Sequence, residues 1–255
     1  MQGIIRPRRG SYFRMKPATP PTKPAPHPSA DRASTAAPNA VLVIAVTAML
    51  LAGMTAGWYG PMAGGDAALL QIPTLVPVAL LVVAARRHWI DTAGFLCAVA
   101  FLGLHTLASY YGYCNVPYDD WLEALGGTRT AALLESDRNH YDRLMHFTYG
   151  LLLVLPVRQS AAKLLGVRGV AATWIAVEFL LATSALYEVG EWLLAVVMAP
   201  EVADRYNGQQ GDIWDAQKDM ALAAAGAISA AALTFALRSI ERFRNGNNVG
   251  QDKRQ

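Results

Sequence analysis

The feature that most constrains this chain is a series of six apolar segments, each close to the roughly 20 residues that a helix needs to cross a bilayer. They lie at residues 40–58, 67–85, 90–109, 143–158, 170–191 and 217–237. Composition agrees, because 16% of the 255 residues are charged, against about 25% in a typical soluble domain. The sequence therefore predicts an all-α, polytopic membrane protein with six transmembrane helices, which has the lipid bilayer as its partner.

The distribution of basic residues predicts the orientation of these helices. If the N-terminus lies inside, seventeen of the 22 Lys and Arg residues fall in cytoplasmic segments. Positive charge marks the cytoplasmic side of membrane proteins, so both termini are expected in the cytoplasm. The small excess of positive charge, 22 basic against 19 acidic residues, argues against a nucleic-acid partner.

The two ends of the chain differ from the membrane domain expected at residues 40–240. Residues 1–39 are basic and rich in proline, a composition that cannot bury enough apolar surface to offset the entropy of ordering. We therefore expect a disordered basic tail there, unless the start of the chain is misassigned. Residues 241–255 are expected to form a cytoplasmic polar tail.

A first polar patch opens the fourth segment. Asp142 and His146 are four residues apart, so they share one face of a helix, with Arg143 beside them. Such a pair can share a proton or a metal ion. The alternative for this pair is an acid that favours the helix N-terminus and a hydrogen-bonded buried histidine.

A second patch closes the fifth segment, where Tyr187 and Glu188 precede Glu191. Two acids three residues apart on an apolar helix repel each other unless a cation lies between them, and ionisable groups inside a membrane point to a functional site. The alternative is an ion pair that fixes helix packing. Glu178, ten residues before Glu188, faces another side and is a weaker candidate.

A third patch opens the sixth segment, where Asp212 precedes Asp215 and Asp219. The first acids favour the positive end of the helix dipole. Asp219 lies inside the helix, next to the small residues 221–227, which allow another helix to approach closely. The three patches therefore predict one cluster at the outer ends of three helices, with His146 within about 6 Å, a charge-interaction distance, of Glu188, Glu191 or Asp219.

Oxygen ligands with one imidazole suit a divalent cation such as Mg²⁺, Mn²⁺, Ca²⁺ or Zn²⁺. In this interpretation Glu188, Glu191, Asp215 and Asp219 hold the cation, and His146, with Asp142, acts as base or ligand. His105 could join the cluster, although an aromatic belt at the membrane interface explains it as well.

Four motifs in order resemble the YjdF-type inner-membrane proteins of bacteria over about residues 40–240. They are Tyr111 to Pro117, Arg138 to Arg143 with His146-Phe147, Ser184 to Glu188 with Glu191-Trp192, and Gly208 to Asp215 with Asp219-Met220. This resemblance implies a multi-pass protein of the bacterial inner membrane and no particular reaction. A fainter likeness to VanZ-like membrane proteins rests on Asp142 and His146, Glu188, and Asp219 with Gly226.

Three functions stay open from the sequence. The first is an outward-facing metal-assisted or acid–base site that acts on an envelope or lipid-linked substrate. The second is a membrane scaffold or partner subunit whose buried acids are structural. The third is an ion- or proton-coupled transporter, although the chain shows no internal repeat.

Overall fold

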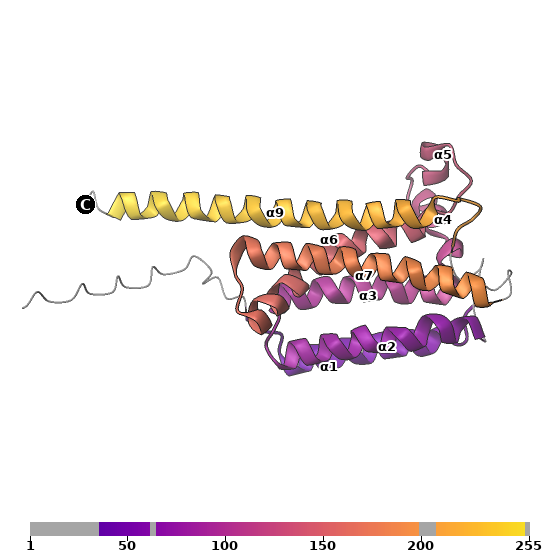
Figure 1. The fold of residues 1–255 in the computed structure, drawn as a ribbon, viewed down its shortest axis with the longest axis horizontal. Helices are drawn as coiled ribbons and strands as arrows, with labels where there is room; N and C mark the ends of the chain where they lie inside the picture. Colours follow the sequence, from indigo (N-terminus) through magenta and orange to yellow (C-terminus); the bar gives the residue numbers. More distant parts are fainter. Residues whose placement is uncertain (1–35, 62–64, 199–207, 253–255) are drawn as a thin grey trace, which may run out of the picture. The chain divides into compact units, whose positions relative to one another are not determined.

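The computed structural model describes residues 36–61, 65–198 and 208–252, and these residues form helices with no β-strand among them. Figure 1 shows the long helices running side by side. They are α1 (Ala40–Gly57), α2 (Gly65–Arg86), α3 (Thr92–Tyr111), α6 (Tyr141–Leu165), α7 (Gly169–Val197) and α9 (Asp215–Asp252). Between α3 and α6 lie the short helices η1 (Tyr113–Asn115), α4 (Tyr118–Ala124) and α5 (Thr130–Leu134).

A helix occupies each of the six predicted segments, and five of these helices, α1, α2, α3, α7 and α9, are long and apolar enough to cross a membrane. Helix α6 has 25 residues but is not among the five, because polar residues inside it, such as His146, Arg158 and Gln159, lower its mean hydropathy. Helix α9 continues to Asp252, so the predicted polar tail is helical up to that residue. Most of the predicted basic tail, residues 1–35, lies outside the described part of the chain.

Polar side chains and glycines set the ends of the helices. The carboxamide of Asn39 accepts a hydrogen bond from the Leu42 amide at 2.8 Å and caps α1, and Asp91 caps α3 in the same way at the Gly94 amide. Such caps satisfy amides that have no partner within the helix. Helix α6 ends at Gly166, whose φ of 70° is a left-handed conformation that glycine adopts without strain.

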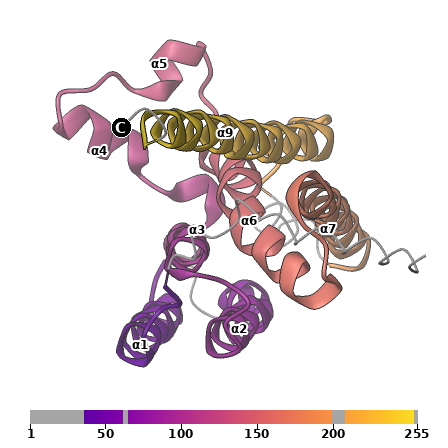
Figure 2. The same cartoon turned by 90° about the vertical axis from the view of Figure 1, so that its left-hand side faces the viewer.

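The long helices form two groups of three. Helices α1, α2 and α3 pack on one another, as do α6, α7 and α9, and the two groups meet through α3 and α6. Figure 2 shows α6 between α3 on one side and α7 and α9 on the other. Each group has its own apolar core, which includes Leu50 and Phe95 in the first group and Val154 and Leu180 in the second.

Helices α6 and α9 approach each other backbone to backbone. A Cβ atom at Gly150 would lie 2.0 Å from the carbonyl oxygen of Ala223, and one at Gly226 would lie 2.1 Å from that of Phe147. Both distances are too short for any side chain, so these glycines permit the contact. The close approach that the small residues of the sixth segment predicted is therefore confirmed, and α6 is the neighbour of Asp219.

The connection from α3 to α6 is held by its own polar contacts. Asp119 on α4 accepts hydrogen bonds from the Thr130 hydroxyl at 2.7 Å and from the Thr130 and Ala131 amides at 2.8 and 3.2 Å. Partial desolvation raises the pKa of Asp119, but the hydrogen bonds from Thr130 and Ala131 outweigh it, so the net pKa is lowered. The carboxylate thereby fixes the start of α5.

Candidate functional site

The six residues that the sequence predicted to form the cation site lie at one end of the helices, where α3 and α7 finish and α6 and α9 begin. They are Asp142, His146, Glu188, Glu191, Asp215 and Asp219. We call Asp142, His146, Glu188 and Asp219 the carboxylate–histidine cluster. Helix α6 supplies Asp142 and His146, α7 supplies Glu188, and α9 supplies Asp219. Asp142, Glu188 and Asp219 are 6%, 7% and 2% exposed, so three acids are buried around one imidazole.

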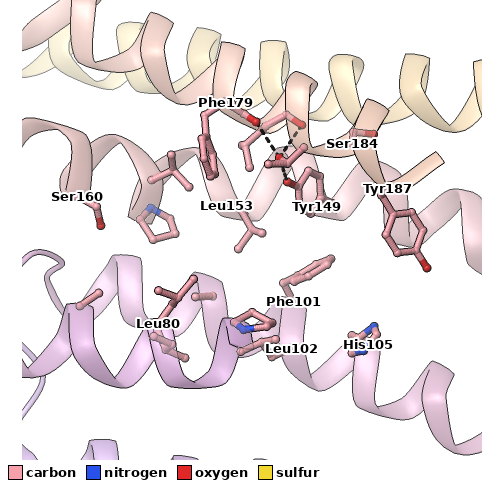
Figure 3. A pocket seen from close by; sticks show the side chains of 18 of the residues that line it. Leu80, Phe101, Leu102, His105, Tyr149, Leu153, Ser160, Phe179, Ser184 and Tyr187 are labelled. Atoms are coloured by element: carbon pink, nitrogen blue, oxygen red, sulfur yellow. Dashed lines mark hydrogen bonds between the residues drawn. The ribbon is translucent and has the colours of Figure 1, made fainter. Parts of the chain in front are cut away.

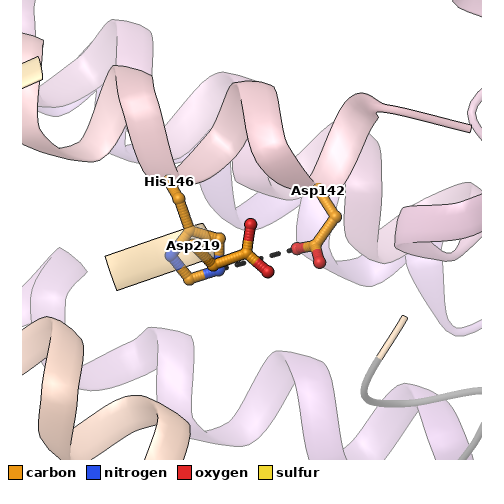
Figure 4. A group of neighbouring side chains, drawn as sticks. All are labelled: Asp142, His146 and Asp219. Carbon is orange, nitrogen blue, oxygen red and sulfur yellow. Dashed lines mark ion pairs between the residues drawn. The ribbon is translucent and has the colours of Figure 1, made fainter. Parts of the chain in front are cut away.

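The distances within this cluster are short. His146 Nε2 lies 3.5 Å from Glu188 Oε1 and 3.7 Å from Asp142 Oδ1, which confirms the predicted approach of His146 to an acid on another helix. Ligand atoms of Asp142, His146 and Asp219 all lie within 4.8 Å of one another. Figure 4 shows the three side chains pointing toward one another from α6 and α9. A single cation between them would contact all three.

Two oxygens of the cluster lack hydrogen-bond partners among the described residues. Asp219 Oδ1 and Glu188 Oε1 are buried and accept no hydrogen bond there. A buried carboxylate oxygen that accepts nothing carries a desolvation cost of several kcal/mol (order of magnitude) unless something else binds it. The cluster thus presents oxygen atoms that are available to a ligand.

Tyr187 and Glu191 flank the cluster on α7. The rings of Tyr187 and His146 meet edge to face with their centroids 6.1 Å apart. Glu191 lies within electrostatic range of Asp142 and Glu188 and shares a hydrogen bond with Tyr187. These two residues border the cluster on the side of α7.

The other two predicted acids, Asp212 and Asp215, lie in an ion-pair network that adjoins the cluster, because Asp215 shares a side-chain hydrogen bond with Asp219. Asp215 Oδ1 accepts from Arg138 Nη2 at 2.6 Å and lies 3.5 Å from Arg143 Nη2. Arg143 also pairs with Asp212, and Lys218 Nζ reaches Asp212 at 2.6 Å. The hydrogen bond from Lys218 is the main reason that the pKa of Asp212 is lowered.

The network also joins two loops that lie beside the cluster. Arg138 donates to the carbonyl oxygens of Gly208 and Gln209 at 3.1 and 2.5 Å. The side chain of Gln210 makes two 2.9 Å hydrogen bonds with the main chain of Asn139, one as acceptor and one as donor. Gly208 packs directly on the cluster, because a Cβ atom there would lie 3.2 Å from Asp142 Oδ2.

His105 belongs to a different group of contacts. Its Nε2 lies 2.6 Å from the Thr74 hydroxyl, and its Nδ1 hydrogen-bonds the Tyr113 hydroxyl. These contacts tie α2, α3 and η1 together at the same end of the molecule. Glu178, the weaker candidate, is exposed on the surface of α7, so it does not take part in the cluster.

Comparison with known proteins bears on the same residues. Residues 40–239 match the family described as "Predicted membrane protein (DUF2238)". This chain belongs to the DUF2238 family. The matched range contains every residue of the cluster and of the ion-pair network, and with five candidate spanning helices the DUF2238 chain is a multi-pass membrane protein.

One curated relative supports the assignment. The DUF2238 chain is 33% identical over 178 residues to "Inner membrane protein YjdF" of Escherichia coli (strain K12), an alignment that covers 67% of this chain and 79% of the relative. The predicted resemblance to YjdF-type proteins is thereby confirmed. No solved structure matches the DUF2238 chain.

Sequence reasoning gave no individual role to two polar residues at this end of the DUF2238 chain, although both lie in the motifs that it quoted. Ser184 lies on α7 one turn before Glu188, it is 4% exposed, and its hydroxyl has no hydrogen-bond partner among the described residues. The four-residue spacing from Glu188 was the signal that could have found it. The pairing of Arg138 could not be predicted, because its partner Asp215 is 77 residues away in the chain.

Proposed function

We propose that this DUF2238 protein is a multi-pass inner-membrane protein whose carboxylate–histidine cluster binds a divalent cation. The cation would serve a metal-assisted or acid–base reaction on a lipid-linked or envelope substrate. The observation that carries the proposal is the meeting of Asp142, His146 and Asp219 within 4.8 Å, where buried oxygens of Asp219 and Glu188 accept no hydrogen bond from the described part of the chain.

The chemistry of the ligands favours a hard or borderline cation. Two or three carboxylates and one imidazole suit Mn²⁺, Mg²⁺ or Zn²⁺ better than a soft metal. A bound cation would offset the repulsion between buried acids on three helices and would lower the pKa of a water molecule bound to it. His146 would act as a ligand or, if the acids alone hold the cation, as the base.

The ion-pair network around Asp215 supports a different role for its members. Two guanidinium groups already neutralise Asp215, so we assign Arg138, Arg143, Asp212 and Asp215 to holding the loops over the cluster. Glu191 borders the cluster and would adjust its charge. The metal role that the sequence predicted for Asp215 and Glu191 therefore moves, in this proposal, to Asp142 and His146.

The experiment is Mn²⁺ binding to the purified full chain, measured by electron paramagnetic resonance and by calorimetry. Asp219→Asn and His146→Gln keep the size of each side chain and remove a ligand. We expect each to weaken binding by more than the 10–100-fold that is typical when only supporting groups around a metal are changed. Glu178→Gln removes an acid of α7 outside the cluster and is the matched control.

If the unaltered protein binds no Mn²⁺, Mg²⁺, Ca²⁺ or Zn²⁺, or if Glu178→Gln weakens binding as much as Asp219→Asn does, the metal site is wrong. The second candidate function is then a scaffold or partner subunit, which the ion-pair network favours. In that case the cluster variants would lower thermal stability and the recovery of a partner protein without affecting any bound metal.

The orientation is also part of the proposal. We propose six spans, with α6 as the fourth, both termini in the cytoplasm and the cluster facing outward, because seventeen of 22 basic residues would then lie inside. Reporter fusions at Arg86, Lys163 and Gln255 should report the cytoplasm, and fusions at Glu123 and Gln209 the outer side. A reversed result at any of these positions would contradict the six-span arrangement.

A further inference from the structure

A long apolar groove runs between the two helix groups. Its volume is about 740 Å³, and α2 and α7 form its two walls, with α3 and α6 between them. Leu80, Phe101, Leu102, Leu153 and Phe179 line it, as Figure 3 shows. The groove is open at its sides, because Leu80 and Phe179 are 60% and 53% exposed although they line it.

One end of the groove is polar and reaches the carboxylate–histidine cluster. His146, Ser184 and Tyr187 line that end, whereas Trp89 and Leu165 line the other. The Ser184 hydroxyl is buried without a hydrogen-bond partner among the described residues, so it can donate to an oxygen of a ligand. A molecule in the groove would therefore touch apolar side chains along its length and the cluster at its tip.

The dimensions of the groove select its occupant. Along α6 the lining extends from Leu165 to His146, which at 1.5 Å per residue is roughly 28 Å, close to the thickness of a hydrocarbon core at about 30 Å. A volume of 740 Å³ lies within the about 300–1,000 Å³ typical of small-molecule sites.

We propose that the groove binds one alkyl chain of a membrane lipid, oriented so that the polar head of the lipid lies at His146 and Ser184. The side opening allows entry from the bilayer, and burial of each methylene against the apolar walls supplies the affinity. Binding of an alkyl chain in the groove does not require that the cluster has an activity. The identification of this lipid as a substrate does rest on the proposed function of the cluster.

The experiment uses the full chain in phosphatidylglycerol vesicles that contain an analogue with a photoreactive diazirine midway along one acyl chain. After irradiation, mass spectrometry locates the labelled residues. We expect label to concentrate on residues that line the groove, such as Leu102 and Phe179, over equally apolar surface residues such as Ile44 and Leu233. Label spread evenly over the exposed residues would overturn the proposal.

Variants that fill the groove make the test specific. Leu153→Trp should reduce groove labelling about tenfold, since an added ring cannot share the space with a chain. Leu80→Trp should act similarly from the α2 wall, at an exposed position where the fold tolerates the bulk. Leu186→Trp makes the same change at a position 68% exposed and outside the groove, and should leave labelling as it was.

Failure of the groove and failure of the metal site give different results. Asp219→Asn should lose Mn²⁺ and keep the label in the groove, because it leaves the apolar walls intact. Undiminished labelling in both Leu153→Trp and Leu80→Trp would overturn the groove assignment whatever the metal data show. Loss of groove labelling in Asp219→Asn would contradict an alkyl-chain site that is independent of the cluster.

Discussion

The contact between Gly226 and Phe147 links helix packing to the geometry of the cluster. Asp219 precedes Gly226 by two helical turns, and His146 precedes Gly150 by about one turn, so both pairs lie on the same seam between α6 and α9. Since no atom can lie between these backbones, the separation of the helices determines how close Asp219 comes to His146.

Gly226→Ala tests this coupling with a single methyl group. Its Cβ would lie 2.1 Å from the Phe147 carbonyl oxygen, and ordinary contact begins at 3.4 Å, so the helices would have to separate by about 1.3 Å. Metal–ligand distances tolerate only about ±0.2 Å, and a displacement of about 1 Å at a working site can cost about 100-fold. We expect Mn²⁺ affinity to fall by about 10–100-fold and stability to fall by about 1–3 kcal/mol.

The assay is Mn²⁺ titration of the purified variant, together with its thermal unfolding in detergent. Gly103→Ala is the control, because Gly103 is also inside a helix and a Cβ atom there would meet nothing within 4 Å. Unchanged Mn²⁺ affinity and stability in Gly226→Ala would refute the argument that the spacing of α6 and α9 determines the geometry of the cluster. Equal damage in Gly103→Ala would show that the effect belongs to any glycine in these helices.

Three further outcomes follow from the described contacts. Arg138→Met would leave Asp215 buried without its main partner, so chemical unfolding should show that the free energy of unfolding falls by about 3–5 kcal/mol. Arg138→Lys keeps the positive charge and should lose less. An unchanged free energy in Arg138→Met would mean that Arg143 alone suffices to pair with Asp215. The pKa of Asp119 is lowered on folding, so its contribution to holding α5 should be fully present above the ordinary value of 3.8 and should disappear as pH falls through the lower folded value. Hydrogen exchange of the first α5 amides should show this loss, and Asp119→Asn should abolish the pH dependence. Burial raises the pKa of Cys114 to about 11, so maleimide should label it at neutral pH far more slowly than the exposed thiol in Leu125→Cys; equal rates would contradict its burial.

The positions of the helices and the convergence of the cluster residues could both be predicted from the sequence. Apolar runs near 20 residues predicted the start of each long helix to within a few residues, whereas α6, α7 and α9 continue 7, 6 and 15 residues past their predicted ends. The four-residue spacing of Asp142 and His146 placed both on one face, and the small residues after Asp219 predicted a close neighbour. Each of these features depends on local spacing, which a sequence records directly.

Partners far apart in the chain could not be assigned in the same way. Asp215 and Asp219 have similar spacing and flanks, yet one pairs with Arg138 and the other borders His146. That division depends on how the loop before α6 lies against the start of α9. The groove could not be predicted from the sequence either, because its two walls, α2 and α7, belong to different helix groups. The separation of these walls depends on how α3 packs on α6.

The composition of α6 has a consequence for how the protein is made. In translocon measurements each Arg, Lys or Asp near the centre of a helix disfavours insertion by about 2.5–3.5 kcal/mol, an effect that weakens toward the ends. Helix α6 carries such residues toward both ends, and their partners, such as Thr173 for Arg158 and Asp212 for Arg143, come from segments synthesised later. In the proposed six-span arrangement, helix α6 would therefore insert stably only after α7 and α9 have emerged, and a chain that stops before α9 should insert α6 less completely than the full chain does.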